Sequence, residues 1–378
     1  MIKSDKVDTC SINKYTKRRR RIPSGVTRKG YSKRNLGTNK YSGIITWYVP
    51  NKNLEKSGIM SPMSRLGKAH NKKKITFSKQ MPTTLTFSQE TNGSHPAVTI
   101  IHTLVSYGDG SYTSGEIGSE HLKLGTTPVN GFVFGCGRNN KGLFGGASGL
   151  MGLGRSDLSL ISQTDSLFKG VFSYCLPSST EPNASGSLVM GFDSSTYKNS
   201  TPILFTKMVQ NPQLPTFYFL NMTGISVGGV ALSLSNSSSN NSFGKGGILI
   251  DSGTVITRLA PSVYKIVKEE FVKQFSGFPS APGFSILDTC FNLSGYDQIN
   301  LPTLKMQFDG NAAELSIDVT GVLYMVKTDA SQICLALASL AYEEEIGIIG
   351  NYQQKNQRVI YDTKGSKLGF AEEICSFN

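Results

Sequence analysis

The chain has 378 residues, of which 38% are hydrophobic and 17% charged, and it contains 40 glycines; this length allows a large buried core and roughly one to three domains. The formal net charge of +13 is unevenly divided, because residues 1–90 hold 21 Lys and Arg against 4 Asp and Glu, whereas residues 91–378 hold 18 against 22. The basicity therefore belongs to the first quarter only, and the charge of the remaining three quarters does not indicate a nucleic-acid partner.

Residues 1–100 differ in pattern from the rest of the chain. They contain the basic runs Lys17–Arg21 and Lys72–Lys74 and little sustained apolar periodicity. One interpretation is a nuclear-targeting or nucleic-acid-binding arm; we favour a disordered basic tail or an N-terminus wrongly assigned to this chain. The chain as given shows no apolar stretch typical of a signal peptide and none long enough to predict a membrane span.

From about Val105 onward, short runs rich in Val, Ile, Phe and Thr alternate with Gly, Ser, Asn and Pro, which is typical of a mostly β protein. Residues 105–115 predict a β-hairpin with a tight glycine-rich turn. Apolar residues at helical spacing predict an amphipathic helix over 262–275. The other predicted elements are strands at 131–137 and 148–154, a short helix at 157–167, a Ser/Asn-rich loop at 233–242, and strands at 345–351 and 357–371 with a turn at 363–366.

An Asp-Ser-Gly turn lies between two apolar, β-branched runs in Ile248–Leu259. Two carboxylates held close together share one proton, so that one acts as a base toward water and the other as an acid toward a carbonyl. Asp251 could supply one of them, with hydroxyls from Ser252 and Thr254 and close backbone approach at Gly253. Taken alone, such a tripeptide more often joins two strands. The chain has no convincing second copy.

A short apolar-apolar-Gly pattern occurs twice, at Gly149–Gly152 and at Gly347–Gly350, about 200 residues apart. The repetition predicts two related lobes. The later copy has the Asp251 turn as its partner, and the earlier copy has no equivalent turn.

Six motifs follow one another with wide spacing: VSYGDGSYTSG (105–115), FVFGCGRNNKGLFGGASGLMGLGR (132–155), FSYCLP (172–177), GGILIDSGTVITRL (246–259), IIGNYQQKN (348–356) and VIYDTKGSKLGFA (359–371). In sequence and order they resemble the pepsin-like aspartic proteinases, and among these the plant nepenthesin/nucellin-like group. The resemblance covers about residues 105–378. It implies a mostly β fold of two lobes with a substrate cleft between them, here with an incomplete N-terminal lobe.

The same resemblance implies three parts: a basic, poorly matched segment at 1–100, the remainder of the N-terminal lobe with its flap at 101–205, and the C-terminal lobe at 206–378. Asp251 would be the catalytic aspartate of the C-terminal lobe, supported by Ser252–Thr254.

The hairpin at 105–115 would be the flap that closes over substrate and excludes water. Tyr107 is its expected substrate-facing residue, and Gly108, Asp109 and Gly110 are expected to build its turn.

The region ahead of the flap departs from the family, which carries there an Asp-Thr-Gly-Ser turn, a Trp and a cysteine-rich insert. The one lookalike is Val7–Ser11, in which Cys10 replaces the required Gly and a cationic run follows. Asp8 is therefore not expected to complete a carboxylate pair. Trp47, within Gly43–Pro50, predicts a stray strand without a carboxylate.

Cysteines and glycosylation sequons point to the secretory pathway. Five of the six cysteines follow residue 130; Cys290 and Cys334 are the favoured disulfide, Cys10 is an improbable partner, and the remaining pairing is open. The Asn-x-Ser/Thr sequons begin at Asn92, Asn183, Asn199, Asn221, Asn236, Asn240 and Asn292. By resemblance the protein is expected to be a secreted glycoprotein, apoplastic or vacuolar.

The resemblance implies an aspartic endopeptidase that cleaves peptides or proteins at acidic pH, as a monomer without metal or cofactor and without nucleic-acid or membrane partners. Only one carboxylate of the catalytic pair, Asp251, is evident, so two alternatives to this monomeric endopeptidase stay open. One is a non-catalytic binding or inhibitor protein on the same fold. The other is a homodimer in which two Asp251 turns build one site, which the remaining N-terminal segments disfavour.

Overall fold

The computed structural model describes residues 46–50, 85–90, 100–142, 144, 147–178, 185–192, 197, 200–232, 247–310 and 313–375. These residues are mostly in strands, which confirms the predicted fold class. They fall into two compact units. The first contains the described residues between 85 and 144, and the second contains 46–50 and the described residues from 147 onward.

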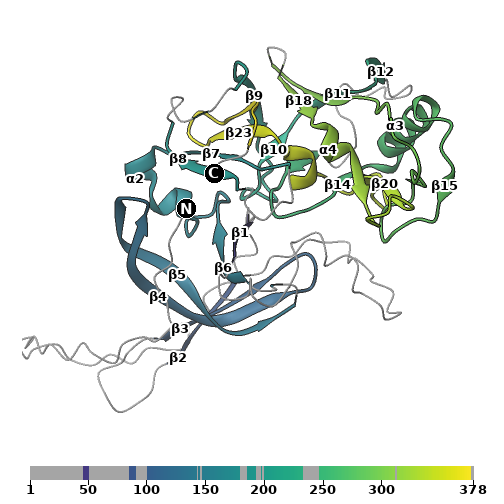
Figure 1. The fold of residues 1–378 in the computed structure, drawn as a ribbon. Coiled ribbons are helices and arrows are strands. Elements are labelled where there is room, and N and C mark those ends of the chain that lie inside the picture. Colours follow the sequence, from purple (N-terminus) through teal and green to yellow (C-terminus); the bar gives the residue numbers. More distant parts are fainter. Residues whose placement is uncertain are drawn as a thin grey trace, which may run out of the picture. The chain divides into compact units, whose positions relative to one another are not determined.

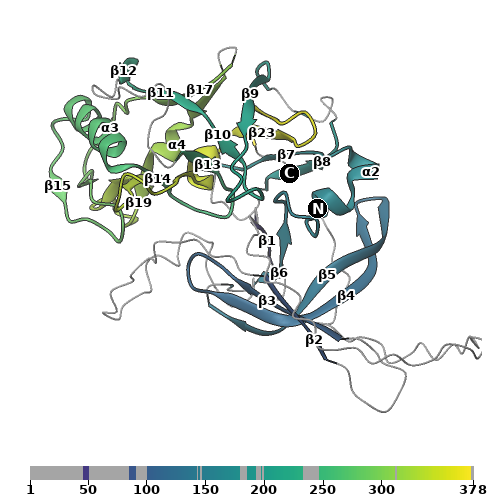
Figure 2. The same cartoon turned by 180° about the vertical axis from the view of Figure 1, so that it is seen from behind.

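The first unit is an antiparallel sheet in the order β2-β3-β4-β5, whose long β4 and β5 form the curved ribbon of Figures 1 and 2. Its strands are β2 (Leu85–Glu90), β3 (Ile100–Ser106), β4 (Tyr112–Leu124) and β5 (Thr127–Lys141). Strands β3 and β4 pair up to Ser106 and Tyr112, which confirms the predicted hairpin. The predicted strand at 131–137 is the middle of β5.

A ten-stranded sheet organises the second unit. In spatial order its strands are β21 (Leu337–Ser339), β14 (Thr257–Leu259), β22 (Gly347–Ile349), β13 (Ile248–Ile250), β10 (Phe219–Leu220), β9 (Leu204–Val209), β24 (Lys367–Glu372), β23 (Gln357–Asp362), β7 (Val171–Cys175) and β8 (Ser187–Met190). Its central strands are short apolar runs whose side chains are buried on both faces, as expected where other elements cover a sheet.

Two four-stranded sheets and several helices complete the second unit. One sheet contains β12 (Val230–Leu232), β11 (Met222–Val227), β17 (Leu304–Phe308) and β18 (Glu314–Ile317), and the other β15 (Ser280–Ala281), β16 (Cys290–Phe291), β20 (Ile333–Leu335) and β19 (Leu323–Met325). The helices are α1 (Leu160–Gln163), α2 (Asp165–Phe168), α3 (Pro261–Gln274), α4 (Val319–Val322) and the 3₁₀ helix η4 (Asn351–Gln354).

The amphipathic helix predicted at 262–275 is confirmed as α3, which begins with Pro261 in its first turn. Its inward-facing side chains Val263, Tyr264, Val267 and Phe271 are buried, which is what its apolar spacing requires.

The single helix predicted at 157–167 is wrong, because two short helices, α1 and α2, occupy this region. They meet at Thr164, whose φ of −110° lies outside the helical range. The Thr164 hydroxyl donates to the Leu160 carbonyl at 2.7 Å. Such a side-chain bond competes with helix continuation.

The predicted strand at 148–154 is β6 (Ala147–Gly152), which pairs antiparallel with β1 (Thr46–Pro50) and brings Trp47 opposite Met151. The expected strand around Trp47 is therefore confirmed as β1, but the expectation that it is stray is wrong, since β1 pairs with β6. The two apolar-apolar-Gly segments differ in their partners, since β6 pairs with β1 and β22 pairs with β13.

The predicted lobe boundary at 205/206 falls inside the second compact unit. This boundary cuts through β9; strands β7 and β8 precede it and β23 and β24 follow it, yet all five belong to the same sheet. Compact units and proposed lobes thus divide the chain at different places, because long-range strand pairing crosses the boundary between the lobes.

Two disulfides join described cysteines. Cys290 pairs with Cys334, as the sequence analysis favoured, across neighbouring positions of β16 and β20. Cys175 at the end of β7 pairs with Cys375, 200 residues later. Cys136 is also disulfide-bonded, and Cys10 lies outside the described residues.

Removing the Cys175–Cys375 bond by replacing both cysteines with Ser should lower the free energy of unfolding by about 2–5 kcal/mol. The loop it closes spans 200 residues, compared with 44 for Cys290–Cys334. In the chain-entropy model, this difference makes its loss about 1 kcal/mol larger than that of the matched Cys290/Cys334 double variant. Urea denaturation of both variants measures this, and a smaller loss for Cys175/Cys375 would contradict the expectation.

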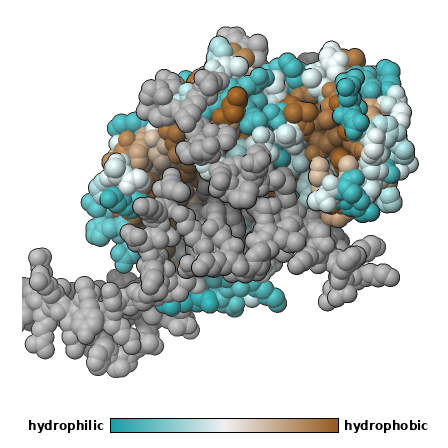
Figure 3. Space-filling view, viewed as in Figure 1, coloured by the Kyte–Doolittle hydropathy of each residue, from teal (hydrophilic) through white to brown (hydrophobic). Residues whose placement is uncertain are grey.

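Exposed apolar side chains come from several separate elements of the second unit, and Figure 3 shows brown and teal areas side by side on its described surface. The most exposed are Phe192, Val319, Met325, Tyr342 and Ile374, each more than half accessible. No helix in the described ranges is both long and apolar enough to cross a lipid bilayer.

Candidate active site

Asp251 directly follows β13, a strand whose three residues are 1–2% exposed. Strand β13 runs parallel to β22, with Ile250 opposite Ile349. The Asp251 amide continues this ladder by donating to the Ile349 carbonyl at 3.0 Å. The carboxylate is therefore attached to a buried strand that is hydrogen-bonded to its parallel neighbour.

The Asp251 carboxylate is held by its own turn. Oδ1 accepts the Gly253 amide at 2.8 Å, and Oδ2 accepts the Thr254 hydroxyl at 2.8 Å. The Thr254 amide returns to the Asp251 carbonyl at 3.3 Å. Both carboxylate oxygens thus have a fixed donor, and the side chain has one defined orientation.

The segment after β22 crosses this turn at close range. Asn351 donates its amide to the Thr254 carbonyl at 2.7 Å and its side-chain Nδ2 to the Ser252 carbonyl at 2.8 Å. Gly350 permits the approach, because a Cβ there would lie 2.5 Å from the Val255 carbonyl oxygen. This contact is the physical reason for the glycine that ends the apolar-apolar-Gly motif.

Burial raises the pKa of the Asp251 carboxyl above its ordinary value, against the opposing effects of the Gly253 amide and the Thr254 hydroxyl. No second carboxylate of the described residues is among the causes. Because the pKa is raised on folding, the neutral form favours the fold. This contribution is present at pH below the ordinary value of 3.8 and is lost as the pH rises through the raised pKa.

The buried side-chain amide of Gln353 holds β14, the strand that follows the Asp251 turn. Gln353 accepts the Thr257 amide at 3.0 Å and donates to the carbonyls of Gly321 and Ala336, each at 2.8 Å. Its side chain is fully buried and all of its groups are used. Gln353 lies in the motif IIGNYQQKN, where no single residue was predicted to have a role. The run of amide side chains beside the apolar strand was the sequence signal that could have indicated this buried hydrogen-bonding residue.

The predicted flap residues lie together at the tip of the β3–β4 hairpin in the first unit. The Tyr107 amide donates to the Ser111 carbonyl at 2.8 Å, and the Gly110 amide donates to the Tyr107 carbonyl at 3.0 Å. Gly110 has a φ of +81°, which favours glycine. Between them, Asp109 accepts the Ser111 amide at 2.9 Å and its hydroxyl as well. This places Gly108, Asp109 and Gly110 in the turn.

The Tyr107 ring packs edge-on against Phe144, with ring centroids 5.7 Å apart. Burial, with a smaller effect from the Asp109 charge, raises the pKa of the Tyr107 phenol to about 12. Tyr107 is therefore a neutral hydrogen-bonding group at any pH from acidic to neutral. The structure brings Asp251, Ser252, Gly253 and Thr254 together in one turn and the flap residues together in another.

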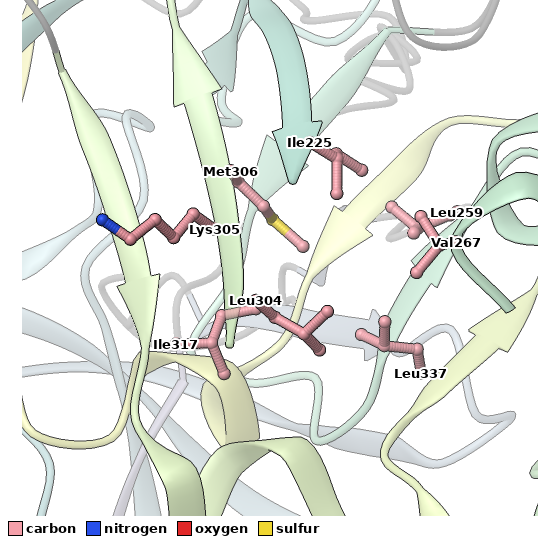
Figure 4. A pocket seen from close by; sticks show the side chains of 8 residues that line it. All are labelled: Ile225, Leu259, Val267, Leu304, Lys305, Met306, Ile317 and Leu337. Atoms are coloured by element: carbon pink, nitrogen blue, oxygen red, sulfur yellow. The ribbon is translucent and has the colours of Figure 1, made fainter. Parts of the chain in front are cut away.

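An apolar crevice lies elsewhere in the second unit, and Figure 4 shows the side chains that line it. They are Ile225, Leu259, Val267, Leu304, Lys305, Met306, Ile317 and Leu337. Lys305 points out of the crevice, and its Nζ contacts Glu314 at 2.7 Å. Since the remaining lining offers no polar group to orient a ligand, the crevice is a packing feature of the core.

Two family models match the chain, described as Xylanase inhibitor N-terminal over residues 43–192 and Xylanase inhibitor C-terminal over residues 217–372. The first includes the strand that carries Trp47. An aspartyl protease family protein of Arabidopsis thaliana is 40% identical over 273 residues, 72% of this chain and 55% of that protein. Aspartic proteinase nepenthesin-1 of Nepenthes gracilis is 38% identical over 277 residues, 71% of this chain and 60% of that protein.

Among solved structures, basic 7S globulin from soybean is similar in fold, with a TM-score of 0.62 and 19% identity over 90% of this chain and 91% of that one. Fold and site motifs together define a protein of the pepsin-like aspartic protease class. The chain belongs to the plant pepsin-like aspartic protease family. It spans little more than half the length of the curated relatives that it matches.

Proposed function

We propose that the protein is an aspartic endopeptidase in which Asp251 supplies one carboxylate of the catalytic pair. The observation that carries this proposal is the Asp251 turn, in which the carboxyl has a hydrogen-bond donor on each oxygen and a pKa raised by burial. A carboxyl that keeps its proton at acidic pH can act as the acid toward a substrate carbonyl while its partner activates water. The substrate is a peptide or protein.

Catalysis needs a second carboxylate, and the sequence contains no other Asp-Ser-Gly or Asp-Thr-Gly turn. We therefore compare two proteins. One is the chain itself, and the other is a chimera that carries the apolar-Asp-Thr-Gly segment of an active relative ahead of Val105. Both are assayed for cleavage of denatured globin at acidic pH, with and without pepstatin. We expect pepstatin-sensitive cleavage by the chimera. A folded chimera that cleaves nothing would contradict the proposal.

In the active chimera, Tyr107→Ala should lower kcat/KM by about 10- to 100-fold, because a flap residue positions the substrate and transfers no proton. Tyr107→Phe keeps the ring that packs on Phe144 and is the matched control. Steady-state kinetics on a fluorogenic peptide measures both variants. An effect of Tyr107→Ala as large as that of Asp251→Asn would contradict a positioning role.

A non-catalytic binding protein is the second candidate. It is favoured by the single Asp-Ser-Gly turn of this sequence, with no second carboxylate of the described residues acting on Asp251. A stable complex with a purified microbial glycanase, together with the absence of pepstatin-sensitive cleavage from both chain and chimera, would support it over proteolysis.

The disulfides support folding in an oxidising compartment. We accordingly place the protein in the secretory pathway, with an apoplastic or vacuolar destination. Digestion with a peptide-N-glycosidase tests this, and a native protein whose mass is unchanged by the enzyme would argue against glycosylation at the seven sequons.

A further inference from the structure

A run of buried polar side chains connects β23 and β7 to the Ile349 carbonyl, which accepts the amide of Asp251. The hydroxyls of Tyr361 and Tyr174 lie 2.9 Å apart, and the Tyr174 hydroxyl donates to Oε1 of Gln354. Gln354 Nε2 donates to the Ile349 carbonyl at 2.9 Å. The same carbonyl accepts the Asp251 amide at 3.0 Å. The side chains of Tyr174, Gln354 and Tyr361 are all completely buried.

The hydrogen bonds of this run have one direction. The Ile349 carbonyl only accepts, so the Gln354 amide must present Nε2 to it and Oε1 to Tyr174. Because Oε1 also only accepts, the single proton of the Tyr174 hydroxyl is committed to Gln354. The oxygen of Tyr174 is then left to accept the proton of Tyr361. Tyr174 therefore holds the Gln354 amide at Oε1, the end opposite the Ile349 carbonyl.

A second contact links Tyr174 to the turn itself. Ser252 is 8% exposed, and the hydrogen-bonding effect of its hydroxyl lowers the pKa of the Tyr174 phenol. Burial is the main cause that raises the pKa of both Tyr174 and Tyr361, and the charge of Asp251 adds to it. Both phenols are therefore neutral hydrogen-bonding groups.

Other titratable groups near this run are engaged elsewhere. Tyr218 also raises the pKa of Tyr174 and Tyr361, but its hydroxyl donates to the Leu153 carbonyl at 2.8 Å. The guanidinium carbon of Arg155 lies over the Tyr218 ring, 6.0 Å from its centre. The Tyr174 hydroxyl is thus the group of this cluster that bonds toward the Asp251 peptide.

Packing alone does not require these polar groups. Burying a hydroxyl or an amide is unfavourable unless every group is bonded, and apolar side chains of similar size fill a core without that cost. Three buried polar side chains that are hydrogen-bonded to one another and to the Ile349 carbonyl therefore point to a role in holding Asp251, whose amide donates to the same carbonyl.

We propose that Tyr174 is a positioning residue for Asp251. It fixes the Gln354 amide, which holds the Ile349 carbonyl, which in turn holds the Asp251 amide at the start of the turn. The catalytic consequence rests on the proposed function, because it requires Asp251 to act on substrate. The network itself does not depend on that function.

The test is the ionisation of Asp251 in the full chain, followed by ¹³C NMR of labelled aspartate carboxyls over a range of pH. The Asp251→Asn spectrum assigns the signal. In Tyr174→Phe the Gln354 Oε1 loses its donor, so the amide is held only through Nε2. The Ile349 carbonyl and the turn with its Gly253 and Thr254 donors, which favour the carboxylate, are then held less well. We expect the pKa of Asp251 to rise by roughly half a unit or more. An unchanged pKa would overturn the proposal.

Tyr361→Phe is the matched control, since it removes a hydroxyl from the same buried cluster but leaves the bond from Tyr174 to Gln354 intact. It should leave the Asp251 titration unchanged. An equal shift in both variants would show a general effect of cluster polarity and would also overturn the proposal.

If Tyr174→Phe fails to fold, the double variant Tyr174→Phe/Gln354→Leu carries the same test, because it leaves no unpaired amide. A raised Asp251 pKa supports the proposal and an unchanged one refutes it. A lack of proteolysis in every form would count against the proposed function alone, since the titration needs no substrate.

Discussion

Asp251→Asn in the globin-cleaving chimera should reduce kcat by about a thousandfold or more, because an amide cannot exchange a proton with water or substrate. The substitution keeps the size of the side chain and one oxygen that accepts hydrogen bonds. The turn bonds from Gly253 and Thr254 therefore limit its effect on the fold. Steady-state kinetics at acidic pH, with a urea denaturation curve for each protein, separates loss of chemistry from loss of structure.

Asp297→Asn is the matched control, since Asp297 lies in the same unit and its side chain is exposed. It makes the same chemical change away from the turn and should leave the rate unchanged. Retained activity in Asp251→Asn, or an equal loss in the control, would contradict the role assigned to Asp251.

Arg358→Met should lower the free energy of unfolding by about 3–5 kcal/mol, because it leaves the buried carboxylate of Glu373 unpaired. Both side chains of this ion pair are 0% exposed. Arg358 donates through Nε at 2.8 Å and Nη2 at 2.7 Å to the two oxygens of Glu373. Nη2 also bonds to Ser187 Oγ at 2.8 Å, and the guanidinium carbon lies 4.8 Å from the Tyr197 ring centre. This pair joins β23 to the end of β24 and to β8.

Lys305→Met is the matched control for this prediction. It breaks a pair with Glu314 whose side chains are 42% and 28% exposed, and it should cost less than about 1 kcal/mol. The double variant Arg358→Met/Glu373→Leu should recover most of the loss, because no unpaired charge remains buried. Urea denaturation measures all three proteins. Equal losses for Arg358→Met and Lys305→Met would show that burial does not determine the cost of this pair.

Local patterns in the sequence were sufficient for elements whose signals lie within a few residues. The Gly-rich hairpin at 105–115 and the helix at 262–275 are such elements, because turn chemistry and apolar spacing act over one or two turns of chain. The mostly β fold followed from the same local evidence. The helix predicted at 157–167 failed at Thr164, where a side-chain hydroxyl competes with the backbone.

Tertiary structure alone decided which distant segments meet. Neither the pairing of β1 with β6 nor the bond from Cys175 to Cys375 follows from local pattern, because each depends on the closure of a long loop. The sequence by itself determined that Asp251 stands in a glycine turn between apolar strands. The chain fold decided what surrounds it, because Asn351 and Gln354 reach this turn only through the parallel pairing of β13 with β22, and Tyr174 only through β7 beside β23.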